Sequence, residues 1–421
     1  MASRVAGEDW FCFAQPDRGG MALAALGCAR VCEATGLDRF ERLSREWMQL
    51  AADALADPPE DAAGSGLVAV GGFAFAPHGG ASPRWRGFAP ASLRVPEISL
   101  GRRDGRTWMT VNRELAPDDT EEACERVLRR LTTLHAEPLP LLDPAPTGRY
   151  EVSSPMPPAH YEEAVARAVE RIRAGGLEKV VLAREVEVVA PADHDPAAIL
   201  AVLREGFPSC YVYAAGRGEA TFLGASPELL VRREGQRAST VALAGSTRRS
   251  ADPAVDDHLA EGLLRSDKDR NENAIVARRI ARSLKPVSVW VTAAAEPFVV
   301  RVANIQHLAA PIRAQLATPM DALALAGLLH PTPAVGGEPD GVAQLLIPAL
   351  EGIDRGWYAG PVGWCDSLGD GEFCVALRCA LLRGPNATCY AGCGVVRDSE
   401  PAAELAETEV KLQALLPVLS G

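Results

Sequence analysis

The stretch "GEFCVALRCALLRGPNATCYAGCGVV", residues 371–396, determines the class of fold that we expect. Only a short turn separates its two apolar runs, 371–383 and 387–396, as is typical of neighbouring antiparallel strands. Strand-like runs of the same kind precede them at 179–189, 209–216, 220–232, 236–244 and 357–366. Helical patterns, which do not alternate regularly with the strands, lie at 252–264, 267–284, 320–328, 339–352 and 402–416. The sequence therefore predicts an α+β fold of large, mainly antiparallel sheets rather than a Rossmann fold.

The composition indicates a globular chain and argues against several functions. The 421 residues carry a formal net charge of −12, and an acidic surface repels phosphate, so we expect no nucleic-acid partner. We find no run of 18 apolar residues and no signal peptide, which predicts a cytoplasmic protein without a membrane span. The ten cysteines are scattered and the seven histidines lack zinc-site spacing, so we expect buried, reduced thiols.

The chain has two regions of different texture. Residues 1–145 are rich in Gly, Ala and Pro and contain a helical pattern at 118–135, and the proline-rich stretch 136–150 is typical of a linker. An amphipathic helix is predicted next, at 158–175, and the strand and helix patterns of the second region follow it.

Two charged residues interrupt apolar strand patterns. Lys179 stands at the entrance of the apolar run 180–183, where it can reach water or guard a sheet edge. Glu228 follows a Ser-Pro break inside the run 220–232. If both side chains are buried, their environments favour a neutral amine and a neutral acid, which are the forms needed by a general base and a general acid.

Arg378 lies within the predicted strand 371–383. Strict alternation places it on one face with Cys374, Ala376 and Ala380, which are all small. An arginine among small side chains leaves room above the sheet for a planar anion. The alternative is a structural ion pair with a neighbouring element.

Acidic residues on two predicted helices suggest a metal site. Glu404, Glu407 and Lys411 form one stripe of the last helix, which can equally be a solvated face with Glu407 and Lys411 as an i,i+4 pair. Glu272 lies on a helix capped by Ser266, at the edge of its apolar stripe, where a carboxylate needs a cation or a donor. Glu272 and Glu407 together would suit a hard divalent ion.

Ten motifs in order resemble those of the chorismate-utilising enzymes, and within them the isochorismate synthases. They are "EKVVLARE", "FLGASPELLVRREG", "ALAGSTRR", "DKDRNENAIV", "NIQHLAAPI", "LHPTPAVGG", "DRGWYAGPVGW", "GEFCVALRCALL", "AGCGVV" and "AELAETEVKL". The resemblance covers residues 150–420 and is loose over 1–145. It implies one domain, 1–421, of two large sheets wrapped by helices, with the site between the sheets.

The resemblance also implies a role for each matching residue. Lys179 would be the general base that activates water, and Glu228 the general acid. Glu272 and Glu407 would hold Mg²⁺, supported by Glu404. The substrate chorismate would be bound by Arg378 and Tyr358 at the enolpyruvyl carboxylate, by the backbone amides of Gly392 and Gly394, and by Lys411, Ser246 and His307 around the ring.

The expected reaction is the magnesium-dependent conversion of chorismate to isochorismate, for menaquinone or siderophore biosynthesis. The alternatives are a salicylate synthase, which goes on to eliminate pyruvate, and a non-catalytic paralogue that binds chorismate. Lys179 argues against the ammonia-using relatives, so we expect no amidotransferase subunit. The chain departs from the common family pattern at Asn273 and Ala310, which affects the periphery of the expected site.

Overall fold

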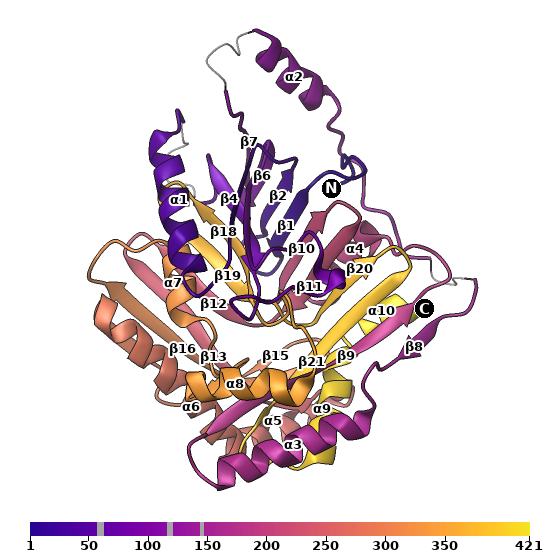
Figure 1. The fold of residues 1–421 in the computed structure, drawn as a ribbon, viewed down its shortest axis with the longest axis vertical. Helices are drawn as coiled ribbons and strands as arrows, with labels where there is room; N and C mark the ends of the chain where they lie inside the picture. Colours follow the sequence, from indigo (N-terminus) through magenta and orange to yellow (C-terminus); the bar gives the residue numbers. More distant parts are fainter. Residues whose placement is uncertain (57–62, 116–120, 144–146) are drawn as a thin grey trace.

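The computed structural model describes residues 1–56, 63–115, 121–143 and 147–421. In these ranges the chain forms two large antiparallel sheets with helices packed around them (Figure 1), so the predicted α+β class is confirmed. The eleven-stranded first sheet has the order β17 (Gly337–Glu338), β9 (Lys179–Val189), β21 (Asn386–Val395), β20 (Cys379–Arg383), β11 (Ala220–Ser226), β10 (Tyr211–Arg217), β1 (Trp10–Gln15), β2 (Met21–Leu26), β6 (Ile98–Arg103), β7 (Arg106–Val111), with β8 (Glu151–Ser153) beside β9. The ten-stranded second sheet has the order β14 (Ser288–Ala293), β16 (Ile305–Leu316), β13 (Arg237–Arg248), β12 (Leu229–Glu234), β19 (Gly371–Val375), β18 (Pro361–Asp366), β4 (Val68–Phe73), β5 (Ala91–Val95), β3 (Arg30–Ala34), with β15 (Phe298–Arg301) beside β16.

Most helices follow the predicted patterns closely. The helices after the N-terminal region are α3 (Pro158–Arg173), α4 (Pro196–Gly206), α5 (Pro253–Arg265), α6 (Asp267–Leu284), α7 (Ala322–Leu329), α8 (Asp340–Glu351), α9 (Pro401–Leu412) and α10 (Leu416–Ser420). However, α4 was not predicted, and the predicted helix 402–416 ends at 412 and is followed by the separate α10. The α6 helix starts where expected, because the Ser266 side chain accepts a hydrogen bond from the amide of Asp269. It packs on β13 and β16 of the second sheet, whereas α3, α8 and α9 pack on β9 and β21 of the first (Figure 1).

The N-terminal region is built into both sheets. Its strand β1 pairs with β10 in the first sheet, and β4 pairs with β18 in the second. Its helices are α1 (Arg39–Asp53) and α2 (Glu121–Thr132). The predicted helix 118–135 and linker 136–150 fall partly outside the described residues, at 118–120 and 144–146.

Two of the predicted strands are wrong, because each changes sheet half-way. The run 220–232 is β11 of the first sheet followed by β12 of the second, and 371–383 is β19 followed by β20. Arg378 lies in the second break with a φ of 49°, in the left-handed region. Regular alternation ends there, so Arg378 does not share a sheet face with Cys374 as predicted.

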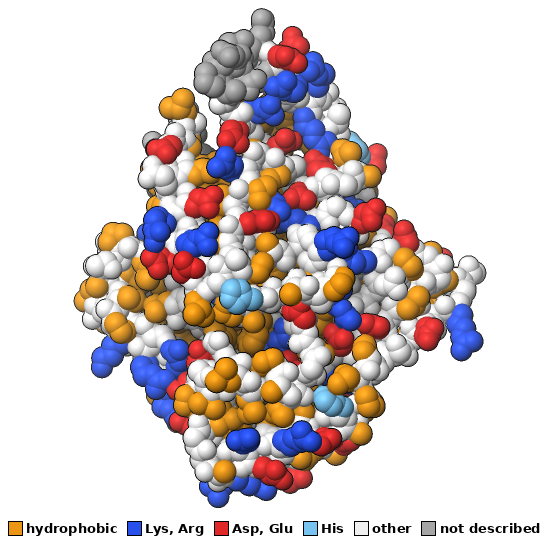
Figure 2. Space-filling view, in the orientation of Figure 1, with side chains coloured by type: hydrophobic (Ala, Val, Ile, Leu, Met, Phe, Trp, Pro, Cys, Tyr) orange, Lys and Arg blue, Asp and Glu red, His pale blue; other side chains and the backbone are white. Residues whose placement is uncertain are grey.

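Two expectations from composition can be examined on the structure. The described cysteines are all free, and all but one of them are buried. Figure 2 shows acidic and basic side chains interspersed on the visible face rather than separated by sign. Among the described residues, no helix is both long enough and apolar enough to cross a bilayer.

Candidate active site

A cleft between the two sheets gathers most of the predicted site residues. It is lined by strands β9 and β21 of the first sheet, by β13 and β16 of the second, and by helices α6 and α9. The segments that join β11 to β12 and β19 to β20 also line it. The predicted residues on its wall are Glu228, Ser246, Glu272, His307, Tyr358, Arg378, Gly392, Gly394, Glu407 and Lys411. The other two, Lys179 and Glu404, contact residues of this wall or its helices.

Lys179 is completely buried at the start of β9, so the alternative that it reaches water is wrong. Its Nζ lies 2.9 Å from Oε1 of Glu272 on α6. Gly394 makes this approach possible, because a Cβ there would lie 2.1 Å from the same oxygen. The glycine of "AGCGVV" is therefore the sequence signal for the close packing of Glu272 against β21.

Glu404 and Glu407 of α9 are each paired with a lysine. Oε1 of Glu407 lies 2.6 Å from Lys411 Nζ and accepts a hydrogen bond of 2.7 Å from Ser246. Burial opposes ionisation of Glu407, but Lys411 and Ser246 outweigh it and lower its pKa to about 2. Glu404 is buried and accepts from Lys268 at 2.8 Å, so this face of α9 is not the solvated one that was the alternative.

The oxygen atoms of Glu404 and Glu407 come within 4.8 Å of each other, together with Cys393 Sγ. Glu272 lines the same cleft from α6. Carboxylate oxygens are the ligands that hard divalent ions prefer, and adjacent buried carboxylates repel each other unless cations balance them. The residues present therefore fit a hard divalent cation, although the lysines supply the balancing charge here.

Glu228 has the environment of a proton donor. Burial raises its pKa to about 8, against the opposing effects of Lys179, Arg378 and Lys411. The carboxyl group therefore retains its proton at neutral pH. Because Glu228 lies at the break between β11 and β12, it lines the cleft instead of packing in a sheet.

Arg378 and His307 meet across the cleft. Nη2 of Arg378 lies 3.2 Å from Nε2 of His307. Burial, with Arg378 and Lys411 adding to it, lowers the pKa of His307 to about 3. The ring is therefore neutral, and its Nε2 accepts from the guanidinium. This contact orients Arg378 as a donor fork toward the cleft.

Sequence reasoning missed several residues around the site. Tyr390 lines the cleft and stacks on Tyr358, with ring centroids 5.1 Å apart. Lys268 stands one turn before Glu272 in the same motif, and this spacing could have indicated its place near the carboxylates. Asn273, noted as a departure, is buried and donates to carbonyls of Ala242 and other residues of β13 and β16, so its role is to join these strands to α6.

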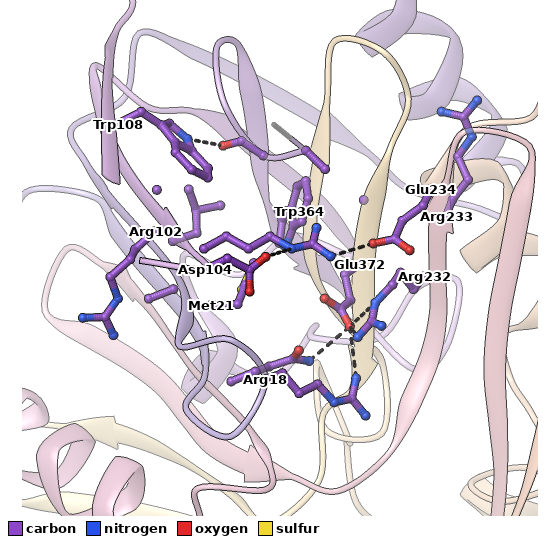
Figure 3. A pocket seen from close by; sticks show the side chains of 18 residues that line it. Arg18, Met21, Arg102, Asp104, Trp108, Arg232, Arg233, Glu234, Trp364 and Glu372 are labelled. Carbon is purple, nitrogen blue, oxygen red and sulfur yellow. Dashed lines mark hydrogen bonds and ion pairs between the residues drawn. The ribbon is translucent and has the colours of Figure 1, made fainter. Parts of the chain in front are cut away.

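Figure 3 shows a second pocket, at the turns of the N-terminal strands, that contains none of the predicted site residues among those that line it. Its charges are largely paired with one another. Gln15 and Arg232 donate to Glu372 at 3.1 and 2.9 Å, and Arg103 donates to Glu234 at 2.8 Å. We therefore interpret this pocket as a junction that fastens β1 and β6 to β12 and β19.

Comparison with known proteins identifies the family. Residues 2–420 match the family described as chorismate binding enzyme. The chain is 39% identical over 408 residues to the salicylate biosynthesis isochorismate synthase of Pseudomonas aeruginosa, which covers 95% of this chain and 83% of that protein. It is 34% identical over 359 residues to isochorismate synthase MenF of Bacillus subtilis, covering 85% and 75% of the two chains.

A solved structure agrees with these relatives over the whole length. The menaquinone-specific isochorismate synthase MenF of Escherichia coli superimposes with a TM-score of 0.80 at 29% identity, covering 100% of this chain and 90% of that one. The family match over residues 2–420 and the shared fold agree with each other, and the chain belongs to the family of chorismate-binding enzymes.

Proposed function

We propose that the protein is an isochorismate synthase, which converts chorismate to isochorismate by adding water at ring carbon 2 and losing the hydroxyl of carbon 4. The observation that carries this proposal is a buried protonated acid, Glu228, on the wall of the cleft, together with a buried amine, Lys179, that contacts Glu272 of the same wall. Their opposite chemical roles match the two proton transfers that the reaction needs. The names of the relatives point to the same activity.

In the proposed reaction Lys179 removes a proton from the attacking water. The new C2–O bond forms while both conjugated ring double bonds shift, from C1=C2 and C5=C6 to C1=C6 and C4=C5, and the C4–O bond breaks. Glu228 donates its proton to the departing hydroxyl, which leaves as water, so atoms and charge balance once Lys179 returns its proton to Glu228 through solvent. Lys179 is the first residue of β9, and Glu228 directly precedes β12. The strands therefore limit the movement of both residues.

The remaining cleft residues bind the substrate. Arg378, oriented by His307, provides a planar pair of donors for the enolpyruvyl carboxylate, and Tyr358 donates from the side. Lys411 and Ser246 lie beside Glu407 and provide donors for the ring carboxylate. Gly392 and Gly394, which line the cleft, would supply backbone amides.

We further propose that Glu272 and Glu407, with Glu404 in support, hold Mg²⁺. The bound ion supplies positive charge that neutralises the ring carboxylate against these glutamates. The chain itself supplies three carboxylates and the lysines that balance them without metal.

The decisive experiment is incubation of the protein with chorismate and magnesium, followed by identification of the products. Isochorismate without pyruvate supports the proposal. Stoichiometric pyruvate with salicylate would move the assignment to a salicylate synthase, and unchanged chorismate would indicate a binding paralogue. The relatives are named for both menaquinone and salicylate biosynthesis, and the cleft residues do not separate these pathways.

A further inference from the structure

The ion pair of Glu351 and Arg355 is the most deeply buried charged pair outside the proposed reaction. Their side chains are 1% and 3% exposed. Nε of Arg355 lies 2.9 Å from Oε2 of Glu351, and Nη2 contacts Oε1 of the same carboxylate. Such a pair pays a large desolvation cost, and apolar residues of similar volume are often at least as stabilising. Its presence here needs another reason than stability.

The pair occupies an unpaired edge of β9. On this edge β17 pairs with residues 179–180 and β8 with 187–189, and in the part of the chain that the structure describes no strand pairs with the segment between them. Glu351 accepts from the amide of Ala183 at 2.7 Å, and Arg355 donates to the carbonyl of Val181 at 2.9 Å. The two side chains thus take the place of a strand just beyond Lys179.

Arg355 also holds the neighbouring segment around Val335. Its Nη1 donates to the carbonyl of Val335 at 2.8 Å, and both Val335 and Val181 line the cleft. The guanidinium carbon lies 4.2 Å from the ring centroid of Phe75 and 5.7 Å from that of Tyr358. Arg355 therefore joins the strand of Lys179, the segment around Val335, the substrate-binding Tyr358 and the N-terminal region.

We propose that Glu351 and Arg355 are positioning residues that set the distance between Lys179 and the substrate held at Tyr358. Neither residue is among those that line the cleft, and both side chains are occupied by each other and by backbone groups of Val181, Ala183 and Val335. The guanidinium reaches two carbonyls and a carboxylate in one plane, which a lysine cannot do. Because this inference rests on the proposed function, the wild-type protein is first assayed for conversion of chorismate.

The main test compares Arg355→Lys with the paired apolar variant Glu351→Leu/Arg355→Met. We expect both to fold, as judged by circular dichroism, and to lower kcat on the order of 10²-fold, because small misplacements of reacting groups cost about this much. The KM for chorismate should rise far less than kcat falls. The matched control is Glu261→Leu/Arg265→Met, which removes an exposed i,i+4 pair on α5 and should keep the wild-type rate.

A wild-type kcat in the folded paired variant or in Arg355→Lys would overturn the proposal. The pair would then be a structural feature of the sheet edge. If the paired variant does not fold, Arg355→Lys alone decides, because it keeps the charge of the pair. If wild type does not convert chorismate, the proposed function fails. Amide hydrogen exchange of the segments around Ala183 and Val335 then tests the inference. The exchange rates of both segments should increase together in Arg355→Lys, and unchanged rates would refute it.

Discussion

Glu228 and Arg378 lie in the two short segments where the chain passes between the sheets, from β11 to β12 and from β19 to β20. These two segments are hydrogen-bonded to each other. The amide of Val375 donates to the carbonyl of Glu228 at 3.1 Å, and the amide of Ala225 donates to the carbonyl of Arg378 at 3.1 Å. Neither residue belongs to a strand, so both side chains are free to line the cleft between the sheets. The proposed acid and the proposed carboxylate-binding group are therefore fixed relative to each other by backbone contacts.

The first prediction concerns Glu228 and pH. Burial raises its pKa from 4.5 to about 8, so the proton-donating form is present below pH 8 and is lost as the pH rises through 8. We expect kcat/KM to fall above about pH 8, and Glu228→Gln to lower kcat by roughly 10²–10⁴ and to remove this limb. A pH–rate profile of both proteins measures this.

The stability of the same variant provides an internal control. A raised pKa means that the folded protein favours the neutral carboxyl group, and this contribution is lost as the pH rises through about 8. Glu228→Gln, which stays neutral, should therefore lose less stability than wild type as the pH rises from about 4.5 to about 8. A variant that melts at a much lower temperature at every pH would mean that its low activity reflects unfolding.

The second prediction concerns Lys179. Substitution by Met removes the proposed base and should lower kcat by roughly 10²–10⁴. Because the side chain is fully buried against Glu272, the variant also leaves a buried carboxylate unpaired, and we expect it to be less stable by about 3–5 kcal/mol in the presence of a chelator. Chemical denaturation measures the loss.

The double variant Lys179→Met/Glu272→Gln separates the two effects. It removes the unpaired charge, so it should recover most of the stability and none of the activity. Near-normal turnover in Lys179→Met would eliminate the amine as the base.

The third prediction concerns the contact of Arg378 with His307. Arg378→Lys keeps the positive charge but loses the planar fork and the contact of Nη2 with the neutral ring. We expect KM for chorismate to rise by about 10–100-fold, with a smaller change in kcat. Arg313→Lys, at an exposed position of β16, is the control and should bind normally. An unchanged KM in Arg378→Lys would assign the arginine a structural role.

Part of this site could be predicted from sequence and part could not. The single positions of Lys179 and Glu228 were informative because a charged residue inside an apolar run must find a partner or a changed pKa. The two changes of sheet were missed, since residues on both sides of Glu228 and Arg378 are equally apolar and a buried strand reads the same in either sheet. Likewise, Lys268 and Arg355 act through contacts 136 and 174 positions away in the chain, and no local pattern reports such contacts.

The last prediction concerns the metal. Glu407 already holds two donors, and Glu404 and Glu272 each hold a lysine, so the carboxylates are compensated without an ion. The fold should therefore survive exhaustive chelation, while turnover of chorismate is lost and returns with Mg²⁺. A cation that binds only the folded state must also raise its melting temperature, and the rise grows with the logarithm of the cation concentration above Kd.

Glu407→Gln should weaken both responses to magnesium, because it removes the charge of one proposed ligand while keeping its shape. The matched control is Glu400→Gln, an exposed glutamate at the start of the same helix whose side chain caps nothing. Activity and melting temperature are measured against free Mg²⁺ for the three proteins. If wild type keeps full activity without any divalent ion, the lysines alone balance the carboxylates during the reaction, and Lys411 and Lys268 rather than a metal would have to neutralise the charge of the substrate.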